Sequence, residues 1–167
     1  YRALRLCAHA RQQAADALDD AVRCEGLRVE AQIHAELGHD ADAARAYGRA
    51  LELAEALGHA AAADESRLGL ASLAIDAGDP KRAAKLLGAV SVSGRSARTE
   101  LRVALCEARL AAPEGRVPLS RMAVDAAERT SDPLLLQVAH LELARALAGA
   151  GLRERAREEL LVIRDRQ

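Results

Sequence analysis

The chain has 167 residues and a formal net charge of −1 at pH 7, with acidic and basic residues in nearly equal number. Such a balance argues against a general affinity for nucleic acids or for membrane surfaces. Alanine (40 residues) and leucine (26) dominate, whereas Phe and Trp are absent and Tyr occurs twice. This composition predicts an all-α protein, because sheets favour β-branched and aromatic residues.

The cysteines and the chain ends bear on the cellular compartment. Cys7, Cys24 and Cys106 are odd in number and show no CxxC or metal-ligand spacing, so we expect reduced thiols in a cytoplasmic protein. No segment has the length and hydrophobicity of a membrane span, and no signal peptide is visible. The sequence begins at Tyr1 rather than at a methionine. We therefore expect a fragment of a longer protein.

Residues 1–26 predict a partial helical hairpin. Leu4 and Ala8 suit one helix, and the alanine-rich run from Ala14 to Ala21 suits the next. The intervening segment has no glycine, so one continuous helix is the alternative. Gly26 is expected to end this hairpin.

Residues 27–59 predict two amphipathic helices joined by a turn at Gly38. Gly38 suits the positive φ that ends a helix, and Asp40 suits the N-cap of the next one. Ala43, Tyr47 and Ala50 then recur at helical spacing. We expect both alanines at a close helix crossing, with Tyr47 buried beside them.

The same pattern recurs after three further glycines. Gly38, Gly78, Gly115 and Gly151 are 40, 37 and 36 residues apart. Apolar or small residues stand five, nine and twelve residues after each: Ala43, Tyr47 and Ala50; Ala83, Leu87 and Val90; Ser120, Val124 and Ala127; Ala156, Leu160 and Ile163. A period of this length predicts stacked helical hairpins, with repeats at about 27–59, 60–94, 95–131 and 132–167.

Capping residues divide the later repeats into helices. Asp79-Pro80 and Asp132-Pro133 each combine an N-cap with a proline at the first helical position. Residues 91–94 predict the most mobile connection. Pro113 and Pro118 are expected to bracket Gly115 in a longer, stiffer turn before a helix over 118–130.

The chain resembles the tetratricopeptide repeat family at these residues. Small residues precede each turn glycine by seven, and Ala43, Tyr47 and Ala50 match the Ala, aromatic and Ala that follow it in the family; the small residues are Ala31, Ala71, Ala108 and Ala144. The later repeats replace the aromatic residue with aliphatic ones, and none keeps the closing proline. The resemblance implies a right-handed α-solenoid of about nine helices in antiparallel pairs, forming a single domain over residues 1–167.

The family resemblance also implies a concave groove lined by the first helix of each pair. The groove positions are Arg28, Gln32 and Glu36; Glu65, Leu68, Ser72, Ile75 and Asp76; Arg102, Leu105 and Arg109; and Val138, Leu141 and Arg145. The early positions lean acidic through Glu36, Glu65 and Asp76, whereas the late ones hold three arginines around two leucines, which suits a carboxylate or an acidic peptide. The alternative is that these are ordinary exposed positions, with the arginines paired to Glu107 and Glu142.

No catalytic or cofactor-binding pattern is present in the sequence. A phosphate-binding GxxxxGK[ST] loop is absent, and Gly149-Ala150-Gly151 reads as a turn. His34 and His39 are five residues apart, not the i, i+4 pair of a zinc-binding helix. His140 falls beside an apolar stripe and is expected to be packed. We therefore predict a protein that is not an enzyme and has no metal or cofactor.

Two functional classes follow. The first is a scaffold that binds a peptide or a partner protein in its groove. The second comes from residues 78–90, GDPKRAAKLLGAV, which resemble the helical repeat region of bacterial regulators that join a signalling ATPase to a LuxR-type DNA-binding domain. That resemblance implies a sensor or oligomerisation arm in transcription regulation, without direct nucleic-acid contact from this segment. Self-association through an apolar end is a further possibility.

Overall fold

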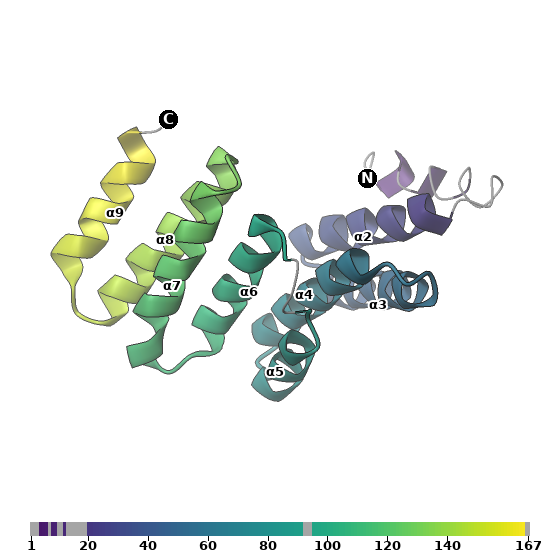
Figure 1. The fold of residues 1–167 in the computed structure, drawn as a ribbon, viewed down its shortest axis with the longest axis horizontal. Helices are drawn as coiled ribbons and strands as arrows, with labels where there is room; N and C mark the ends of the chain where they lie inside the picture. The colour runs from purple at the N-terminus through teal and green to yellow at the C-terminus, as the bar shows by residue number, and fades with distance from the viewer. Residues whose placement is uncertain (1–3, 7, 10–11, 13–19, 92–94, 166–167) are drawn as a thin grey trace. The chain divides into compact units, whose positions relative to one another are not determined.

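The computed structural model describes residues 4–6, 8–9, 12, 20–91 and 95–165. Eight helices of the described part are labelled in Figure 1, and no strand occurs within these ranges. The prediction of an all-α protein is confirmed, and consecutive helices pack as a helical repeat requires. The right-handed superhelix stays a prediction. Most of the hairpin expected over 1–26, including Cys7, lies outside the described residues.

The chain divides into two compact units, Tyr1–Val92 and Ser93–Gln167. The division falls within residues 91–94, the segment whose composition predicts a loose connection. The expected single domain over 1–167 stays a prediction, and each unit is described by itself.

Unit 1 contains α2 (Asp20–Glu36), α3 (Asp40–Ala56), α4 (Ala60–Asp76) and α5 (Pro80–Gly88). Each helix packs against the next, and α2 also contacts α4. Ala43 and Ala50 have no exposed surface and Tyr47 is 6% exposed, so their predicted burial is confirmed. Tyr47 packs with Ala31, Ala46 and Leu70 in one cluster of the core.

The start of α2 differs from the prediction. The helix begins at Asp20 and runs through Gly26, which was expected to separate two hairpins. Glycine inside a helix costs about 1 kcal/mol relative to alanine. Tertiary contacts offset that cost, because Cys24 and Ala31 are both buried and the Cys24 thiol donates a 3.4 Å hydrogen bond to the Ala50 carbonyl of α3.

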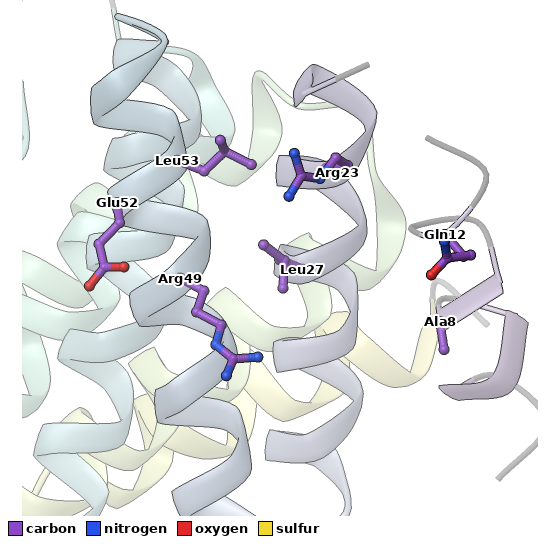
Figure 2. A pocket seen from close by; sticks show the side chains of 7 residues that line it. All are labelled: Ala8, Gln12, Arg23, Leu27, Arg49, Glu52 and Leu53. Carbon is purple, nitrogen blue, oxygen red and sulfur yellow. The ribbon is translucent and has the colours of Figure 1, made fainter. Parts of the chain in front are cut away.

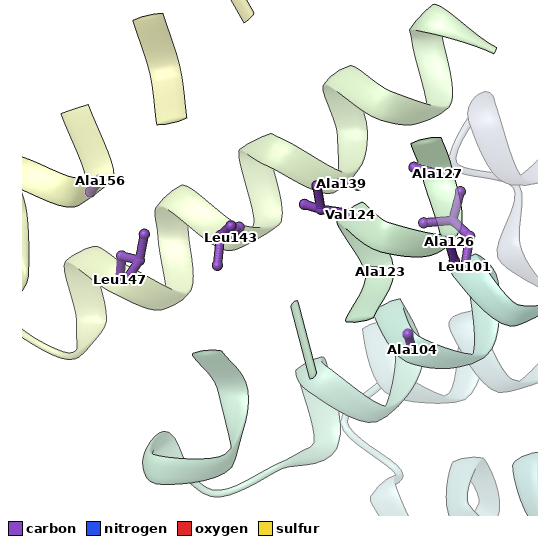
Figure 3. Packing of buried hydrophobic residues seen from close by; sticks show 10 residues of the cluster. All are labelled: Leu101, Ala104, Ala123, Val124, Ala126, Ala127, Ala139, Leu143, Leu147 and Ala156. Atoms are coloured by element: carbon purple, nitrogen blue, oxygen red, sulfur yellow. The ribbon is translucent and has the colours of Figure 1, made fainter. Parts of the chain in front are cut away.

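Unit 2 contains α6 (Ala97–Leu110), α7 (Pro113–Glu128), α8 (Pro133–Gly149) and α9 (Arg153–Asp165), which lie side by side in chain order (Figure 1). Again each helix packs against the next, and α6 also contacts α8. Figure 3 shows its core, in which alanines separate a few larger residues: Leu101, Ala104, Ala123, Val124, Ala126, Ala127, Ala139, Leu143, Leu147 and Ala156.

Gly115 is not a turn residue, which corrects the third repeat boundary. It lies in the first turn of α7, which begins at Pro113 rather than at residue 118. Proline at the first helical position loses no hydrogen bond, and Pro118, inside the helix, removes only the bond to the carbonyl of Glu114. The predicted stiff turn between the two prolines is therefore wrong, because α7 absorbs both.

The other helix boundaries follow their local signals. Asp79 accepts a hydrogen bond from the Arg82 amide at 3.0 Å, and Asp132 accepts one from the Leu134 amide at 3.0 Å. Both predicted N-caps are confirmed. Asp40 is not a cap, because His39 takes that position and Asp40 becomes the first helical residue, where its charge suits the helix dipole.

Candidate functional site

The predicted groove residues of unit 1 lie on α2 and α4, which contact each other. Gln32 and Glu36 are exposed on α2, and the Gln32 amide donates a 3.3 Å hydrogen bond to Glu36. Ser72 and Ile75 on α4 are half-buried. This face therefore offers a polar and acidic surface rather than an apolar channel.

Arg28, the remaining predicted groove residue on α2, is already engaged. Its guanidinium binds the carboxylate of Glu25 on the same helix through two nitrogens, one of them at 2.9 Å. The hydrogen bond from Arg28 lowers the pKa of Glu25 below its ordinary value, an effect that partial burial of Glu25 opposes. The pair is intrahelical, so Arg28 is held along α2.

Leu68 is not a groove residue, which corrects the prediction. Its side chain has no exposed surface and is among the largest fully buried side chains of the described residues. The helix that carries it, α4, packs against α2, α3 and α5, so little of its circumference reaches solvent. Counting residues from a turn glycine places Leu68 on the correct helix but cannot give the number of neighbours that cover that helix.

The predicted groove residues of unit 2 lie on α6 and α8, which also contact each other. Arg102 and Leu105 are half-buried on α6, and Arg109 is exposed. Leu141 and Arg145 are exposed on α8. Contact between α6 and α8 brings the two helices that carry these predicted residues together within one unit.

An apolar stripe on α8 extends this face beyond the predicted residues. Leu134, Val138 and Leu141 are 70%, 47% and 37% exposed. Their spacing of four and three residues places them on one side of the helix. Leu134 was missed because no family position corresponds to it. The signal was present in the run Leu134-Leu135-Leu136, which has more apolar residues than the buried face of α8 needs.

Arg145, like Arg28 of unit 1, is paired within its own helix. Arg145 donates a hydrogen bond to Glu142, as the alternative interpretation expects. Its side chain is 64% exposed, and a solvated pair of this kind contributes only about 0.3–0.5 kcal/mol. Such a pair is readily exchanged for another carboxylate.

A cavity in unit 1 is lined by residues of α2 and α3 and by Ala8 and Gln12 (Figure 2). Its volume is about 570 Å³, and Arg23 and Arg49 stand on either side of Leu27. Arg23 pairs with Asp20 in its own helix. Gln12 and Ala8 form the opposite wall. The lining contains no nucleophile with a neighbouring base, so we assign no chemistry to it.

A second cluster in unit 1 surrounds the turn between α2 and α3. Ligand atoms of His34, His39 and Asp42 all lie within 4.8 Å of one another, and the two imidazole rings are 5.7 Å apart. The sequence predicts no zinc site here, because the two histidines straddle the predicted turn and lack the i, i+4 spacing of a zinc-binding helix. In the structure the turn at Gly38 folds the chain back and brings both rings to the same place.

Unit 2 holds a buried histidine of its own. His140 of α8 is 7% exposed, and its Nδ1 lies 2.7 Å from a carboxylate oxygen of Glu159 on α9. Its packed position agrees with the expectation from sequence. The pair joins two helices at a point away from the exposed α8 stripe, which suits a structural role.

Cys24 and Cys106 are buried and form no disulfide, and burial raises the pKa of the Cys24 thiol. A raised pKa leaves the thiol protonated at neutral pH and poorly reactive. None of the described helices is long and apolar enough to cross a membrane.

Comparison of the chain with protein-family models and with curated proteins gives no match. The resemblances to tetratricopeptide repeats and to LuxR-type regulators therefore rest on the residues that carry them.

Proposed function

We propose that this chain is a non-enzymatic, tetratricopeptide-like interaction module. In unit 2 its α6–α8 face binds an acidic, amphipathic peptide segment of a partner protein. The observation that supports this proposal is the exposed apolar stripe of Leu134, Val138 and Leu141 on a helix that also carries Arg145. The proposed binding involves no catalytic step and no cofactor.

The apolar stripe would supply most of the affinity. Transferring apolar surface out of water contributes about 25 cal/mol per Å². Three aliphatic side chains at four- and three-residue spacing present a ridge of the kind that meets the apolar face of a partner helix. Leu105 of α6, half-buried beside the core, belongs to the same pair of contacting helices.

The arginines would select the charge of the ligand. Arg102 and Arg109 lie on α6 and Arg145 lies on α8, and a guanidinium binds a carboxylate through two parallel hydrogen bonds. Exchange of Glu142 for a ligand carboxylate costs Arg145 little, because its present ion pair is solvated. In unit 1 the corresponding helices present Glu36 and Asp76, which would repel an acidic peptide.

Titration with two designed peptides tests the proposal. The first peptide is a helix with leucines at i, i+3 and i+7 and glutamates beside them, and the second replaces each glutamate with lysine. We expect the acidic peptide to bind more tightly, with an affinity that falls as salt is added. Val138→Asp should weaken binding at least about tenfold, or ~1.4 kcal/mol, because it places a carboxylate among the apolar contacts. Arg145→Ala should weaken it by a smaller factor.

Met122→Asp is the matched control. Met122 is 56% exposed on α7, the second helix of its pair, so this variant adds the same charge at an exposed apolar position outside the proposed face. Its affinity should equal that of the parent. Equal binding of the two peptides, or equal losses in Val138→Asp and Met122→Asp, would contradict the proposal.

The oligomerisation arm of a LuxR-type regulator remains the alternative function. Leu160 and Leu161 on α9 are 47% and 46% exposed, which leaves an apolar surface for a second copy. Light scattering during size-exclusion chromatography distinguishes the two functions. A dimer that Leu160→Asp converts to a monomer, together with no peptide binding, would favour the regulator arm.

A further inference from the structure

The turn between α2 and α3 places two histidines in contact through backbone hydrogen bonds. Gly38 has φ 72°, its amide bonds the Ala35 carbonyl at 3.0 Å, and the His39 amide bonds the His34 carbonyl at 2.9 Å. These two bonds define a Schellman turn. The longer-range bond, from His39 to His34, joins two residues whose side chains lie next to each other in such a turn. His34 and His39 occupy those two positions.

Three other turns of the described chain have the same backbone but different side chains at these positions. The corresponding outer bonds join His59 to Ala54, Asp79 to Ala74 and Leu152 to Leu147, at 2.8–2.9 Å. Apolar pairs such as Leu147 and Leu152 are the usual occupants. The turn itself does not require two imidazoles, because the turn at Gly58 has the same backbone with Ala54 and His59 at these positions.

The first turn of α3 adds a carboxylate to the two imidazoles. The His39 carbonyl accepts hydrogen bonds from the Asp42 and Ala43 amides at 3.0 Å, which fixes Asp42 one turn above His39. The ligand atoms of His34, His39 and Asp42 then lie within 4.8 Å of one another. In a tetrahedral zinc site with bonds of about 2.0–2.1 Å, ligand atoms are roughly 3.3 Å apart. Small side-chain rotations would close the difference.

His34 provides a second, separate observation at this cluster. Its Nδ1 is buried and has no hydrogen-bond partner among the described residues. Buried polar atoms are nearly always paired, and ligation to a metal ion satisfies an imidazole lone pair. A cavity of about 220 Å³ adjoins this ring, lined also by Glu30 on α2 and by Asp42 and Arg45 on α3.

We propose that His34, His39 and Asp42 bind a divalent transition-metal ion, with Zn²⁺ as the best fit. Two imidazoles and one carboxylate form a ligand set that zinc accepts, and the exposure of His39 leaves room for water at a fourth position. Imidazole ligands disfavour Mg²⁺ and Ca²⁺, which prefer oxygen. The ion would join the end of α2 to the start of α3, independently of peptide binding in unit 2.

Arg45 is the group that competes with the ion. Its guanidinium binds Oδ1 of Asp42, but this arginine is 73% exposed and the ion pair is solvated. A zinc ion can displace it or use the second carboxylate oxygen. Arg49 lines the same cavity and adds a second positive charge there. The positive charges of Arg45 and Arg49 lower the affinity for a metal cation, but His34, His39 and Asp42 all stay available as ligands.

Calorimetric titration of the whole chain with zinc sulfate tests the proposal. We expect one zinc ion per chain, and no heat from magnesium at the same concentration. His39→Ala should weaken zinc binding more than tenfold, because it removes one of three ligands while keeping the backbone amide that forms the turn. His59→Ala is the matched control: it removes the histidine at the same position of another Schellman turn, and it should bind zinc as the parent does.

Cobalt substitution supplies a readout of the ligands themselves. Tetrahedral Co²⁺ absorbs in the visible range, and thiolate ligation would add a near-ultraviolet charge-transfer band. We expect the visible bands without the thiolate band, lost in His39→Ala and in Asp42→Asn and kept in His59→Ala. Unchanged zinc affinity in both His39→Ala and Asp42→Asn, or an equal loss in His59→Ala, would overturn the proposal. Circular dichroism checks that each variant is folded. If His39→Ala has a lower helix content than the parent, the zinc affinity of Asp42→Asn is the deciding measurement.

Discussion

The two units bury different residues nine positions after Gly38 and after Gly115, in each case on the second helix of a contacting pair. In unit 1 this residue is Tyr47 of α3, and a Cβ atom on Gly69 of α4 would lie 2.4 Å from its ring. In unit 2 it is Val124 of α7, which shares a core cluster with Ala139 and Leu143 of α8. The aromatic residue requires a glycine on the facing helix, whereas the smaller valine packs among ordinary aliphatic residues. The second helix of a hairpin therefore packs in two different ways in α3 and in α7.

Truncating the two residues should have the largest effect. We expect Tyr47→Ala to lower the free energy of unfolding by about 3–5 kcal/mol, because a large cavity would remain between α3 and α4. Val124→Ala removes less volume and should cost about 2 kcal/mol. Urea unfolding followed by circular dichroism measures both. An equal cost for the two variants would remove the distinction between the units.

The buried polar contacts of the two units provide the second test. Asp64 of α4 is 5% exposed and accepts hydrogen bonds from Arg67 at 2.9 Å and from the Ser91 amide at 3.2 Å. Asp64→Ala leaves both donors without this acceptor and should cost about 1–3 kcal/mol. His140→Leu leaves one group, the Glu159 carboxylate, without its partner. Because the Glu159 side chain is 25% exposed, water can hydrate it, and the variant should lose less than about 1 kcal/mol of stability. The reverse order in thermal melts would contradict this interpretation.

Adding one methyl group at Gly69 gives the smallest effect but the sharpest test. Gly69→Ala gains about 1 kcal/mol in helix propensity and loses about 1–3 kcal/mol through overpacking against Tyr47. The net effect should be a loss. In a Tyr47→Val background the overpacking disappears, and the same substitution should stabilise the protein by up to about 1 kcal/mol. The same sign in both backgrounds would show that Tyr47 does not impose the glycine.

The sequence by itself determined the helices and most of their ends. Asp79-Pro80 and Asp132-Pro133 begin helices. Gly38, Gly78 and Gly151 adopt positive φ just after α2, α4 and α8. These features depend on residues within one helical turn, where capping and φ preferences act directly. The periodic burial of small residues could also be predicted, because helical spacing places them on one face.

Only the tertiary structure decided the helix boundaries and the burial that depend on contacts with other helices. Gly26 continues α2 because burial of Cys24 and Ala31 outweighs its helix penalty. Gly115 lies inside α7 rather than at a turn. Leu68 is buried because three neighbouring helices cover α4. In each case the deciding contact comes from another helix, which the residue's own neighbours in sequence do not reveal.

The candidate sites divide in the same way. The sequence pointed to the arginines and Leu141 of unit 2, because family positions can be counted along a helix. It did not reveal the uncovered Leu134, since exposure depends on which neighbours pack against α8. Nor did it reveal that His34 and His39 meet, because five residues separate them on any helix and only the reversal at Gly38 brings the rings together.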